Sequence, residues 1–385
     1  MKMKLLGPTN SKCKFIHHFL AAVTKKRKML LLLLILTVFL FITTLRLPVS
    51  LNHLQLKFHS NMDINSTTLM ENHNQSVAPL SATYAHPRSL IIVILSARRN
   101  FAQRKLVRET YGAIKKANNI TISALYFMLG DLDKPDDERV DPSKIEAENM
   151  AFGDIVMGHF VDSYRNLTMK TVMAYEWIRS ICQDDQFVLK TDDDVLVNIF
   201  KLTQDLNELS PTDVKSSNFW CIIHWGENTV TEEISPFYVK PGTFSNDLFP
   251  DHCAGLGYVT TVTVVDRIIK EVYKSFVGEL FAHEDVFMTA IVPEKINSKI
   301  DSDVDRLKLV ERYEWQSYDL ETLMEGDNSK FLVDLLRCPI DRMENYLEFR
   351  KRFGKAVFYL FTHDSEFEER YRKLWRIIRN TFKSY

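Results

Sequence analysis

Short, mainly apolar runs recur through the middle of this 385-residue chain, at 89–95, 124–129, 154–161 and 187–189. Such runs predict strands that are buried on both faces of a parallel sheet. A polar, helix-compatible stretch at 98–110 follows the first run. Apolar residues recur at helical spacing before the last run, at Met169, Val172, Met173, Trp177 and Ile181. Strands that alternate with helices predict an α/β fold with a mostly parallel sheet.

A different apolar pattern occupies residues 29–45, which carry no charge. As a helix this run is about 25 Å long, enough for a thin bilayer. A buried core helix would show a polar face, and a cleaved signal peptide would be followed by a small-residue cleavage site. We therefore expect a transmembrane signal anchor. The basic block at 25–28 precedes it, so the positive-inside rule predicts a cytosolic tail at 1–28 and a luminal remainder.

The luminal part divides by composition. Residues 46–87 are rich in Asn, Ser, Thr and His and predict an extended stem. Residues 88–300 contain the strand and helix patterns and predict the catalytic domain. Residues 301–385 are charged and aromatic, and they predict a mostly helical C-terminal extension packed on that domain. The basic residues of this extension are more typical of a solvated face than of a binding patch.

Charge and cysteines narrow the possible functions. The net charge of −1 gives no electrostatic argument for a nucleic-acid partner. Four cysteines fall on the luminal side, and an even number in an oxidising compartment predicts disulfides, although the sequence leaves all three pairings open. They are Cys182, Cys221, Cys253 and Cys338. No C-x-x-C pair indicates a zinc site. N-glycosylation is expected at some of four sequons, which begin at Asn65, Asn74, Asn119 and Asn166.

Three carboxylates, Asp192, Asp193 and Asp194, follow the apolar run at 187–189 directly. Ligands in α/β sheets bind at the carboxyl ends of strands, and carboxylates there suit Mg²⁺ or Mn²⁺ that also binds a substrate phosphate. A solvated acidic turn is the alternative, but apolar residues on both sides favour the metal site. The spacing does not fit an EF-hand or an aspartyl-phosphate phosphatase, and the chain has no P-loop.

A second acidic pair, Glu284 and Asp285, lies among apolar residues. A carboxylate beside a metal-bound sugar diphosphate can act as general base towards an acceptor hydroxyl. The same pair also fits a helix N-terminus, where the helix dipole favours acids. The two interpretations are compatible.

Five stretches, in this order, resemble the β-1,3-galactosyltransferase family of inverting Golgi glycosyltransferases. They are RKLVRETYG at 104–112, GDIVMGHFVDSYRNLTMKT at 153–171, KTDDDV at 190–195, CAGLGYV at 253–259 and EDVF at 284–287. The resemblance covers about residues 88 to 295. It departs from the family pattern at Tyr111, where the family has Trp, and at His159, where it has an acid.

The resemblance implies a GT-A type, Rossmann-like nucleotide-sugar transferase domain, a single-pass type II Golgi anchor, a UDP-sugar donor and Mn²⁺. It implies that Asp192 and Asp194 bind the metal and that Asp285 is the general base. The residues expected to bind the metal-linked donor are Arg104, Arg108, Lys190, Asp192, Asp193 and Glu284.

The expected reaction transfers galactose from UDP-galactose to the 3-hydroxyl of an acceptor sugar on a glycoprotein or glycolipid, with inversion. An N-acetylglucosaminyl- or N-acetylgalactosaminyltransferase is the neighbouring alternative. Family members often have a further metal-binding His after the E-D-V motif, and here the only His beyond His283 is His363. A catalytically inactive, sugar-binding relative is therefore a third alternative.

Overall fold

The computed structural model describes residues 89–131, 142–182, 186–215, 218–276, 278, 280–299, 306–311, 316–319, 343–361 and 365–382. The expected tail, span and stem lie outside these residues and stay predictions, as do His363 and Cys338. Among the helices of the described ranges, none has the length and apolar character needed to cross a membrane.

The α/β pattern predicted from the sequence is confirmed. The strands are β1 (Ser89–Leu95), β2 (Lys116–Ala117), β3 (Ile120–Asp131), β4 (Ile155–Val161), β5 (Phe187–Asp192), β6 (Val195–Val197), β7 (Asn218–His224), β8 (His252–Thr261), β9 (Lys308–Glu311), β10 (Gln316–Asp319) and β11 (Ala356–Leu360). The helices are α3 (Phe101–Glu109), α4 (Pro142–Phe152), α5 (Leu167–Ile181), α6 (Ile199–Asn207), α7 (Pro211–Lys215), α8 (Val262–Ser275), α9 (Glu284–Val286), α10 (Val292–Asn297), α13 (Met343–Phe353) and α14 (Phe367–Phe382).

The main sheet has the strand order β2-β3-β1-β5-β8-β7-β9, and β4 also pairs with β3. Pairing is parallel among β4, β3, β1 and β5, as the buried apolar runs predicted. Beyond β5 the sheet is mixed, because β8 runs antiparallel to both β5 and β7. The expectation of a mostly parallel sheet therefore holds for the half that begins the domain.

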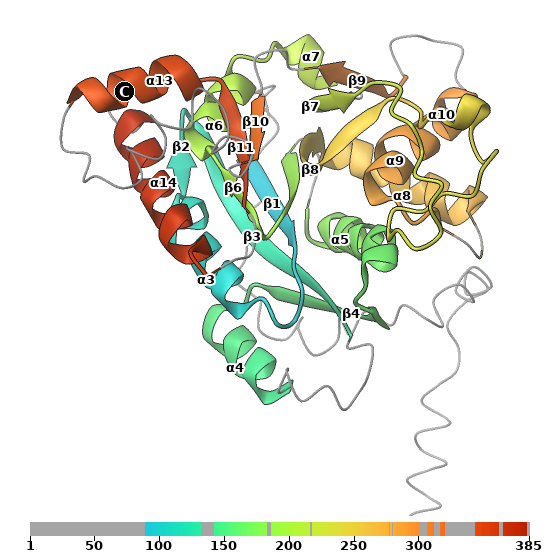
Figure 1. The fold of residues 1–385 in the computed structure, drawn as a ribbon, viewed down its shortest axis with the longest axis horizontal. Coiled ribbons are helices and arrows are strands. Elements are labelled where there is room, and N and C mark those ends of the chain that lie inside the picture. The colour runs from blue at the N-terminus through green and yellow to red at the C-terminus, as the bar shows by residue number, and fades with distance from the viewer. Residues whose placement is uncertain are drawn as a thin grey trace, which may run out of the picture. The chain divides into compact units, whose positions relative to one another are not determined.

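Strand β1 shows why the sheet has helices on both faces. Leu90, Ile92 and Ile94 point into one hydrophobic cluster with residues from α3, α6 and α14. Ile91 and Val93 point into a second cluster with residues from α5 and α8. Figure 1 shows these two helical layers on opposite sides of the sheet. Alternation along a strand thus buries every side chain of β1 beyond Ser89.

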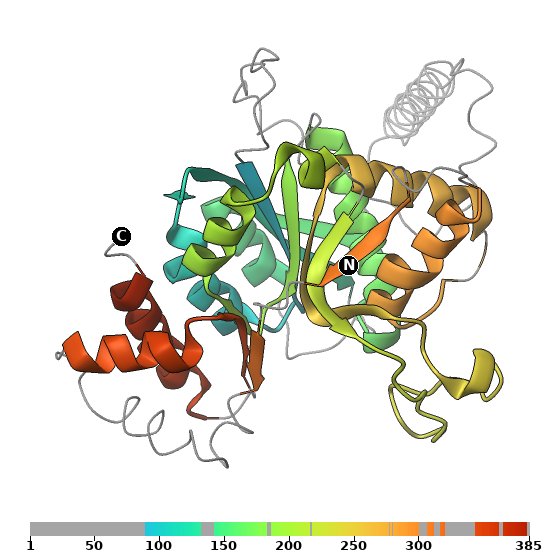
Figure 2. The same ribbon diagram turned by 90° about the horizontal axis from the view of Figure 1, so that it is seen from above.

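The C-terminal residues complete the fold around the acidic triplet. Strand β11 pairs antiparallel with β6, which begins directly after the triplet. Helix α14 packs beside it, where the Tyr371 hydroxyl donates to the Val195 carbonyl at 3.3 Å and Trp375 stacks on Phe200 at 5.9 Å. Figure 2 shows α13, α14 and β11 together at one side of the sheet. The described part of 301–385 therefore contributes strands as well as helices.

The structure contains one of the disulfides that the sequence left open. Cys221 of β7 and Cys253 of β8 form a disulfide, with Cα atoms 5.6 Å apart. Cys182 forms no disulfide with another cysteine of the described residues, and burial raises the pKa of its thiol to about 12. The disulfide joins neighbouring strands on the antiparallel side of the sheet.

Candidate active site

The acidic triplet forms the turn between β5 and β6. The Asp193 amide donates to the Leu95 carbonyl at the end of β1, at 3.2 Å. The Phe361 amide donates to the Asp194 carbonyl, also at 3.2 Å. The turn is thus fixed from both sides, at the carboxyl ends of β1 and β5, where α/β sheets bind ligands.

The three carboxylates of the turn have different surroundings. The Asp193 carboxylate is buried and accepts hydrogen bonds from the Ser96 hydroxyl at 2.6 Å and the Asn100 amide at 2.9 Å. It therefore braces the β1–α3 loop. For Asp194, burial and then the charges of Asp192 and Asp193 raise the pKa to about 7. The turn is crowded with negative charge that the protein alone compensates poorly.

Lys190 provides a cation in direct contact with this turn. Its ammonium group, 2% exposed, lies 3.1 Å from Asp192 Oδ1 and 3.0 Å from Glu284 Oε2, and it donates to the Gly255 carbonyl at 2.6 Å. Burial lowers the pKa of Lys190, but Asp192 and Glu284 outweigh it, and the pKa lies above its ordinary value. The lysine therefore stays charged and joins the two acidic motifs.

Glu284 lies deeper than the sequence suggests. Its second oxygen accepts a hydrogen bond from the Tyr258 hydroxyl at 2.6 Å, so both carboxylate oxygens have partners. Burial raises the pKa of Glu284, and Lys190 opposes that shift without cancelling it. Glu284 thus helps to hold Lys190 in position through their ion pair. Its direct contact with the donor stays a prediction.

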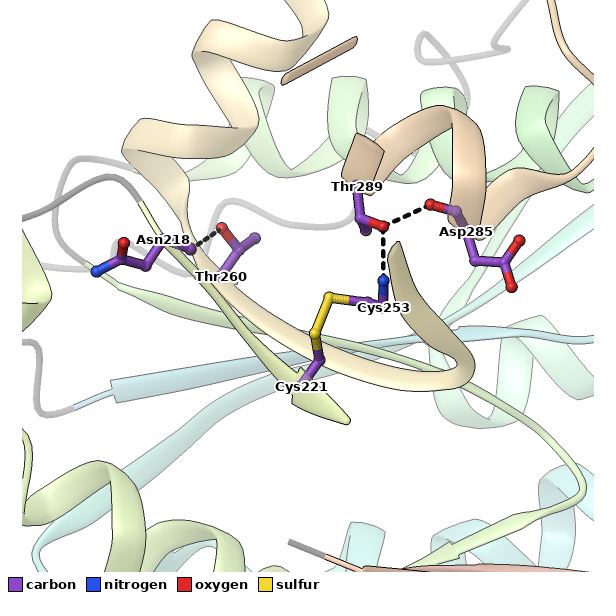
Figure 3. The surroundings of a disulfide bond; sticks show 6 residues. All are labelled: Asn218, Cys221, Cys253, Thr260, Asp285 and Thr289. Carbon is purple, nitrogen blue, oxygen red and sulfur yellow. Dashed lines mark hydrogen bonds between the residues drawn. A yellow bond between two sulfur atoms is a disulfide. The ribbon is translucent and has the colours of Figure 1, made fainter. Parts of the chain in front are cut away.

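Asp285 is half-buried in the first turn of α9, consistent with the predicted helix N-terminus. Its Oδ1 accepts from the Val286 amide at 2.8 Å. Its Oδ2 would lie 2.8 Å from a Cβ atom at position 255, so Gly255 allows the carboxylate to approach β8 closely. The Asp285 carbonyl accepts from the Thr289 hydroxyl, which in turn accepts from the Cys253 amide beside the disulfide, and the carboxylate points away from them (Figure 3).

Arg104 and Arg108, both expected near the nucleotide, lie together in ion pairs. Arg104 is fully buried and bonds both oxygens of Glu148, the nearer at 2.7 Å, and the Ala97 carbonyl at 2.6 Å. Arg108 bonds Glu148 at 2.6 Å and both oxygens of Asp154 at 2.7 Å. We call these four residues the arginine cluster. A nucleotide contact by either arginine would require it to leave these pairs, and that role stays a prediction.

We call Lys190, Asp192, Asp194, Glu284 and Asp285 the carboxylate cluster. Sequence reasoning missed Tyr164, although it stands in a quoted motif. Its ring packs edge-on against Phe237 at 5.0 Å, and burial, followed by the charges of Asp285 and Asp192, raises its pKa to about 12. A half-exposed tyrosine at the edge of the carboxylate cluster can contact a ligand. Glu148 carried no sequence signal, because its arginine partners lie 40 residues or more away.

The donor set of the carboxylate cluster fits a hard divalent cation. Asp192 Oδ1 is buried and accepts no hydrogen bond within the described part of the chain, apart from its ionic contact with Lys190. Asp192 and Asp194 offer carboxylate oxygens on one short turn, as Mg²⁺ and Mn²⁺ prefer. Two protein ligands leave positions for water or substrate phosphate. The donor set therefore suits an ion that is shared with water or with a substrate phosphate.

An α/β sheet with a carboxylate-rich turn at its carboxyl edge and a separate acid beside it defines a candidate site for transfer from a metal-bound phosphate ester. The sequence of residues 102–303 matches the galactosyltransferase family, and this match spans more than half of the chain. The chain belongs to that family, as its motifs predicted.

Individual relatives agree with this assignment. Beta-1,3-galactosyltransferase 1 of Mus musculus and of Homo sapiens are each 30% identical over 203 residues, which are 52% of this chain and 58% of theirs. Beta-1,3-galactosyltransferase 5 of Pan troglodytes is 27% identical over 218 residues, 56% of this chain and 68% of its own. The chain thus spans 58% of the length of the first of these relatives.

Solved structures show only slight likeness. The apo WbbM bifunctional glycosyltransferase has a TM-score of 0.38 and 10% identity, over 80% of this chain and 53% of its own. A glycosyltransferase involved in glycosylation of the major capsid of PBCV-1 has a TM-score of 0.32 and 8% identity, over 74% of this chain and 98% of its own.

Proposed function

We propose that the chain is a metal-dependent, inverting β-1,3-glycosyltransferase with a GT-A type domain that transfers galactose from UDP-galactose to the 3-hydroxyl of a glycan. The observation that carries the proposal is the carboxylate cluster, in which one lysine faces four acids at the carboxyl end of β5. Family membership supports the reaction class. The names of the β-1,3-galactosyltransferase relatives support the sugar and the linkage.

Each member of the cluster has a proposed task. Asp192 and Asp194 hold a divalent cation, and Mn²⁺ is the ion proposed. When bound, it supplies positive charge that stabilises the leaving diphosphate. Lys190 keeps Asp192 and Glu284 oriented. Asp285 accepts the proton of the acceptor hydroxyl, which attacks the anomeric carbon from the face opposite the diphosphate. A single displacement inverts the anomeric centre.

The proposed location is the Golgi membrane, with residues 29–45 as a type II anchor and the sheet in the lumen. The uncharged run and the preceding basic block support it. The disulfide suits an oxidising compartment. Asn119 is exposed in a turn, whereas the Asn166 amide donates to the Val161 carbonyl at 2.8 Å. Of these two sequons, we therefore propose Asn119 as the better glycosylation site.

The test measures UDP release and product linkage with the purified full-length chain. UDP-galactose, UDP-GlcNAc and UDP-GalNAc are each supplied with Mn²⁺ or EDTA, over a panel of β-linked sugar acceptors. We expect Mn²⁺-dependent release with UDP-galactose and a β-1,3 product identified by NMR. Asp285→Asn should lower kcat about 10²–10⁴-fold, because the general base is lost.

Asp266→Asn is the matched control, since Asp266 on α8 pairs with Arg179 and Lys270 at the surface. It should keep full activity. Release with another donor would move the proposal to that sugar. A folded protein that binds UDP but releases none from any donor would overturn the enzyme and favour the inactive relative.

A further inference from the structure

A second group of potential metal ligands lies where β7 ends and β8 begins. His224 and His252 are directly opposite each other in the antiparallel ladder, and their rings stack with centroids 5.4 Å apart. Glu227 follows His224 by three residues. One ligand atom from each of the three side chains lies within 4.8 Å of the other two, and no other group of this kind occurs among the described residues.

His252 already has the hydrogen bond of a metal-binding histidine. Its Nδ1 lies 2.8 Å from the Pro250 carbonyl, and because a carbonyl only accepts, Nδ1 carries the proton. Nε2 therefore keeps its lone pair. The ring is 4% exposed and packs against Phe249 at 5.8 Å, so its orientation is fixed. Histidine ligands usually donate their second nitrogen to a backbone carbonyl or carboxylate in this way.

His224 and Glu227 supply the other two ligands. The Nδ1 atom of His224 contacts a carboxylate oxygen of Glu227 directly, which places a donor and an acceptor where a cation can replace the shared proton. Glu227 is half-exposed and His224 about one third exposed, so both can adjust. Tetrahedral zinc with bonds of about 2.0–2.1 Å needs its ligand atoms roughly 3.3 Å apart. The ligand atoms lie within 4.8 Å of one another, and side-chain rotations would bring them to that spacing.

The backbone that carries the two histidines is held rigidly. Cys253 is the neighbour of His252 and is joined to Cys221 on the strand that ends at His224. The Cys253 amide also donates to Thr289 at 3.0 Å (Figure 3). The ladder register shifts between Cys221 and Ile223, and this crosslink ties the two strands together at that shift, so the imidazoles face each other before any ion binds.

We propose that His224, Glu227 and His252 bind Zn²⁺ and close the base of the loop at residues 225–251. Two imidazole nitrogens and one carboxylate suit zinc, whereas Mn²⁺ and Mg²⁺ prefer sites made of oxygen ligands. Three protein ligands leave a fourth position for water. The site is separate from the carboxylate cluster and takes a different class of ion.

The loop gives the zinc site a role. The Phe237 carbonyl within it accepts from His283 Nε2 at 3.0 Å, and the Phe237 ring packs on Tyr164. Both partners border the carboxylate cluster. In Figure 2 the loop between β7 and β8 extends away from the sheet. An ion at its base orders a segment that forms one border of the candidate active site.

The test titrates Co²⁺, a spectroscopic substitute for zinc, into the metal-stripped full-length chain. An Asp192→Asn, Asp194→Asn background keeps cobalt at the acidic turn from contributing. We expect one Co²⁺ per chain with the intense visible absorption of tetrahedral coordination, displaced by Zn²⁺. His224→Gln and His252→Gln should weaken binding about 100-fold or more, and Glu227→Gln about 10–100-fold.

His159→Gln is the matched control, because His159 also faces a carboxylate, Asp131, at 3.1 Å but has no second histidine. It should leave the cobalt spectrum unchanged. Zinc should also slow Glu-C protease cleavage after the exposed Glu232 and Glu233 of the loop.

No tetrahedral cobalt signal, or equal affinity in the three variants and the control, would overturn the site. Glu227→Gln keeps the test valid if the variant at buried His252 fails to fold. The readout is metal binding, so the result does not depend on whether the chain transfers a sugar.

Discussion

The arginine cluster and the carboxylate cluster both combine basic and acidic side chains, but they differ in the ratio of positive to negative charges. In the arginine cluster two guanidinium groups face two carboxylates, and each bonds at least one of them through two nitrogens. In the carboxylate cluster one lysine faces four acids, and the pKa of Asp194 is raised to about 7. The first arrangement is complete within the protein. In the second, acids outnumber the one lysine, and we propose that an added cation compensates them.

This difference separates stability from function. Buried ion pairs with every partner present fix the positions of the elements that carry them. Crowded acids cost folding free energy and persist where a ligand compensates them. Mutations that remove a carboxylate should therefore have opposite effects in the two clusters.

The largest effect is expected for Glu148→Gln. It removes the carboxylate shared by both arginines, leaving two buried cations with fewer partners, and should lower the free energy of unfolding by about 3–5 kcal/mol. Urea unfolding followed by circular dichroism measures this loss. Glu109→Gln, which breaks surface pairs with Arg372 and Lys105, should cost under about 1 kcal/mol. Equal losses would show that the arginine cluster is not a scaffold.

A sharper comparison lies within the acidic turn itself, between two adjacent residues. Asp193→Asn weakens charge-assisted bonds to Ser96 and Asn100 and should lower the free energy of unfolding by about 1–2 kcal/mol. Asp194→Asn relieves charge repulsion and should raise it by on the order of 1 kcal/mol. Urea unfolding in EDTA at pH 7.5 measures both. Losses of similar size would mean that the turn is not strained by its charge.

The smallest effects are expected in the dependence on pH. Because the folded pKa of Asp194 is raised from 3.8 to about 7, its carboxyl binds a proton more readily when folded, and its contribution to stability falls as pH rises through that range. Burial raises the pKa of Glu148, but its bonds to Arg104 and Arg108 lower it overall. The Glu148 contribution is therefore present above pH 4.5 and is lost as pH falls through the lowered folded pKa.

Unfolding free energies from pH 4 to 7.5, metal-free, test both signs. The advantage of Asp194→Asn over the wild type should grow from pH 4 to 7. The deficit of Glu148→Gln should stay constant above pH 4.5 and shrink below it. A constant Asp194→Asn difference across the range would contradict the crowding described for the turn.

Local sequence patterns predicted many of the strands and helices, but few of the contacts between segments that are distant in the sequence. The apolar run at 89–95 coincides with β1 because strand burial on both faces is written in consecutive residues. Strand β8 was not predicted, because Gly255 and Gly257 interrupt its apolar pattern. Both glycines are needed because other side chains approach β8 closely at these positions. A Cβ atom there would meet Asp285 at 2.8 Å or the Phe358 ring at 2.6 Å. Such contacts join distant segments, and no sequence period reports them.

The candidate active site also depends on contacts between distant segments. Motifs located the acidic turn and Asp285, but not which carboxylate of the turn faces the β1–α3 loop. That choice depends on Ser96 and Asn100, nearly a hundred residues earlier. The disulfide also could not be chosen from spacing, because Cys221 and Cys253 meet where the register of β7 and β8 shifts, with Cys221 opposite Tyr258 and Cys253 opposite Ile223.

Because β6 pairs with β11, which is synthesised much later, this part of the fold forms late during synthesis of the chain. Asp194 receives its backbone bond from Phe361, so the acidic turn cannot be fixed until the ribosome has passed that residue. At 5–20 residues per second this wait lasts roughly 10–30 s. During that interval the first strands can already be paired while β6 lacks its neighbour. A chaperone in the compartment of synthesis would therefore meet β6 without its partner strand during that interval, and chains that end before Ala356 would lack β11 and with it this support for the acidic turn.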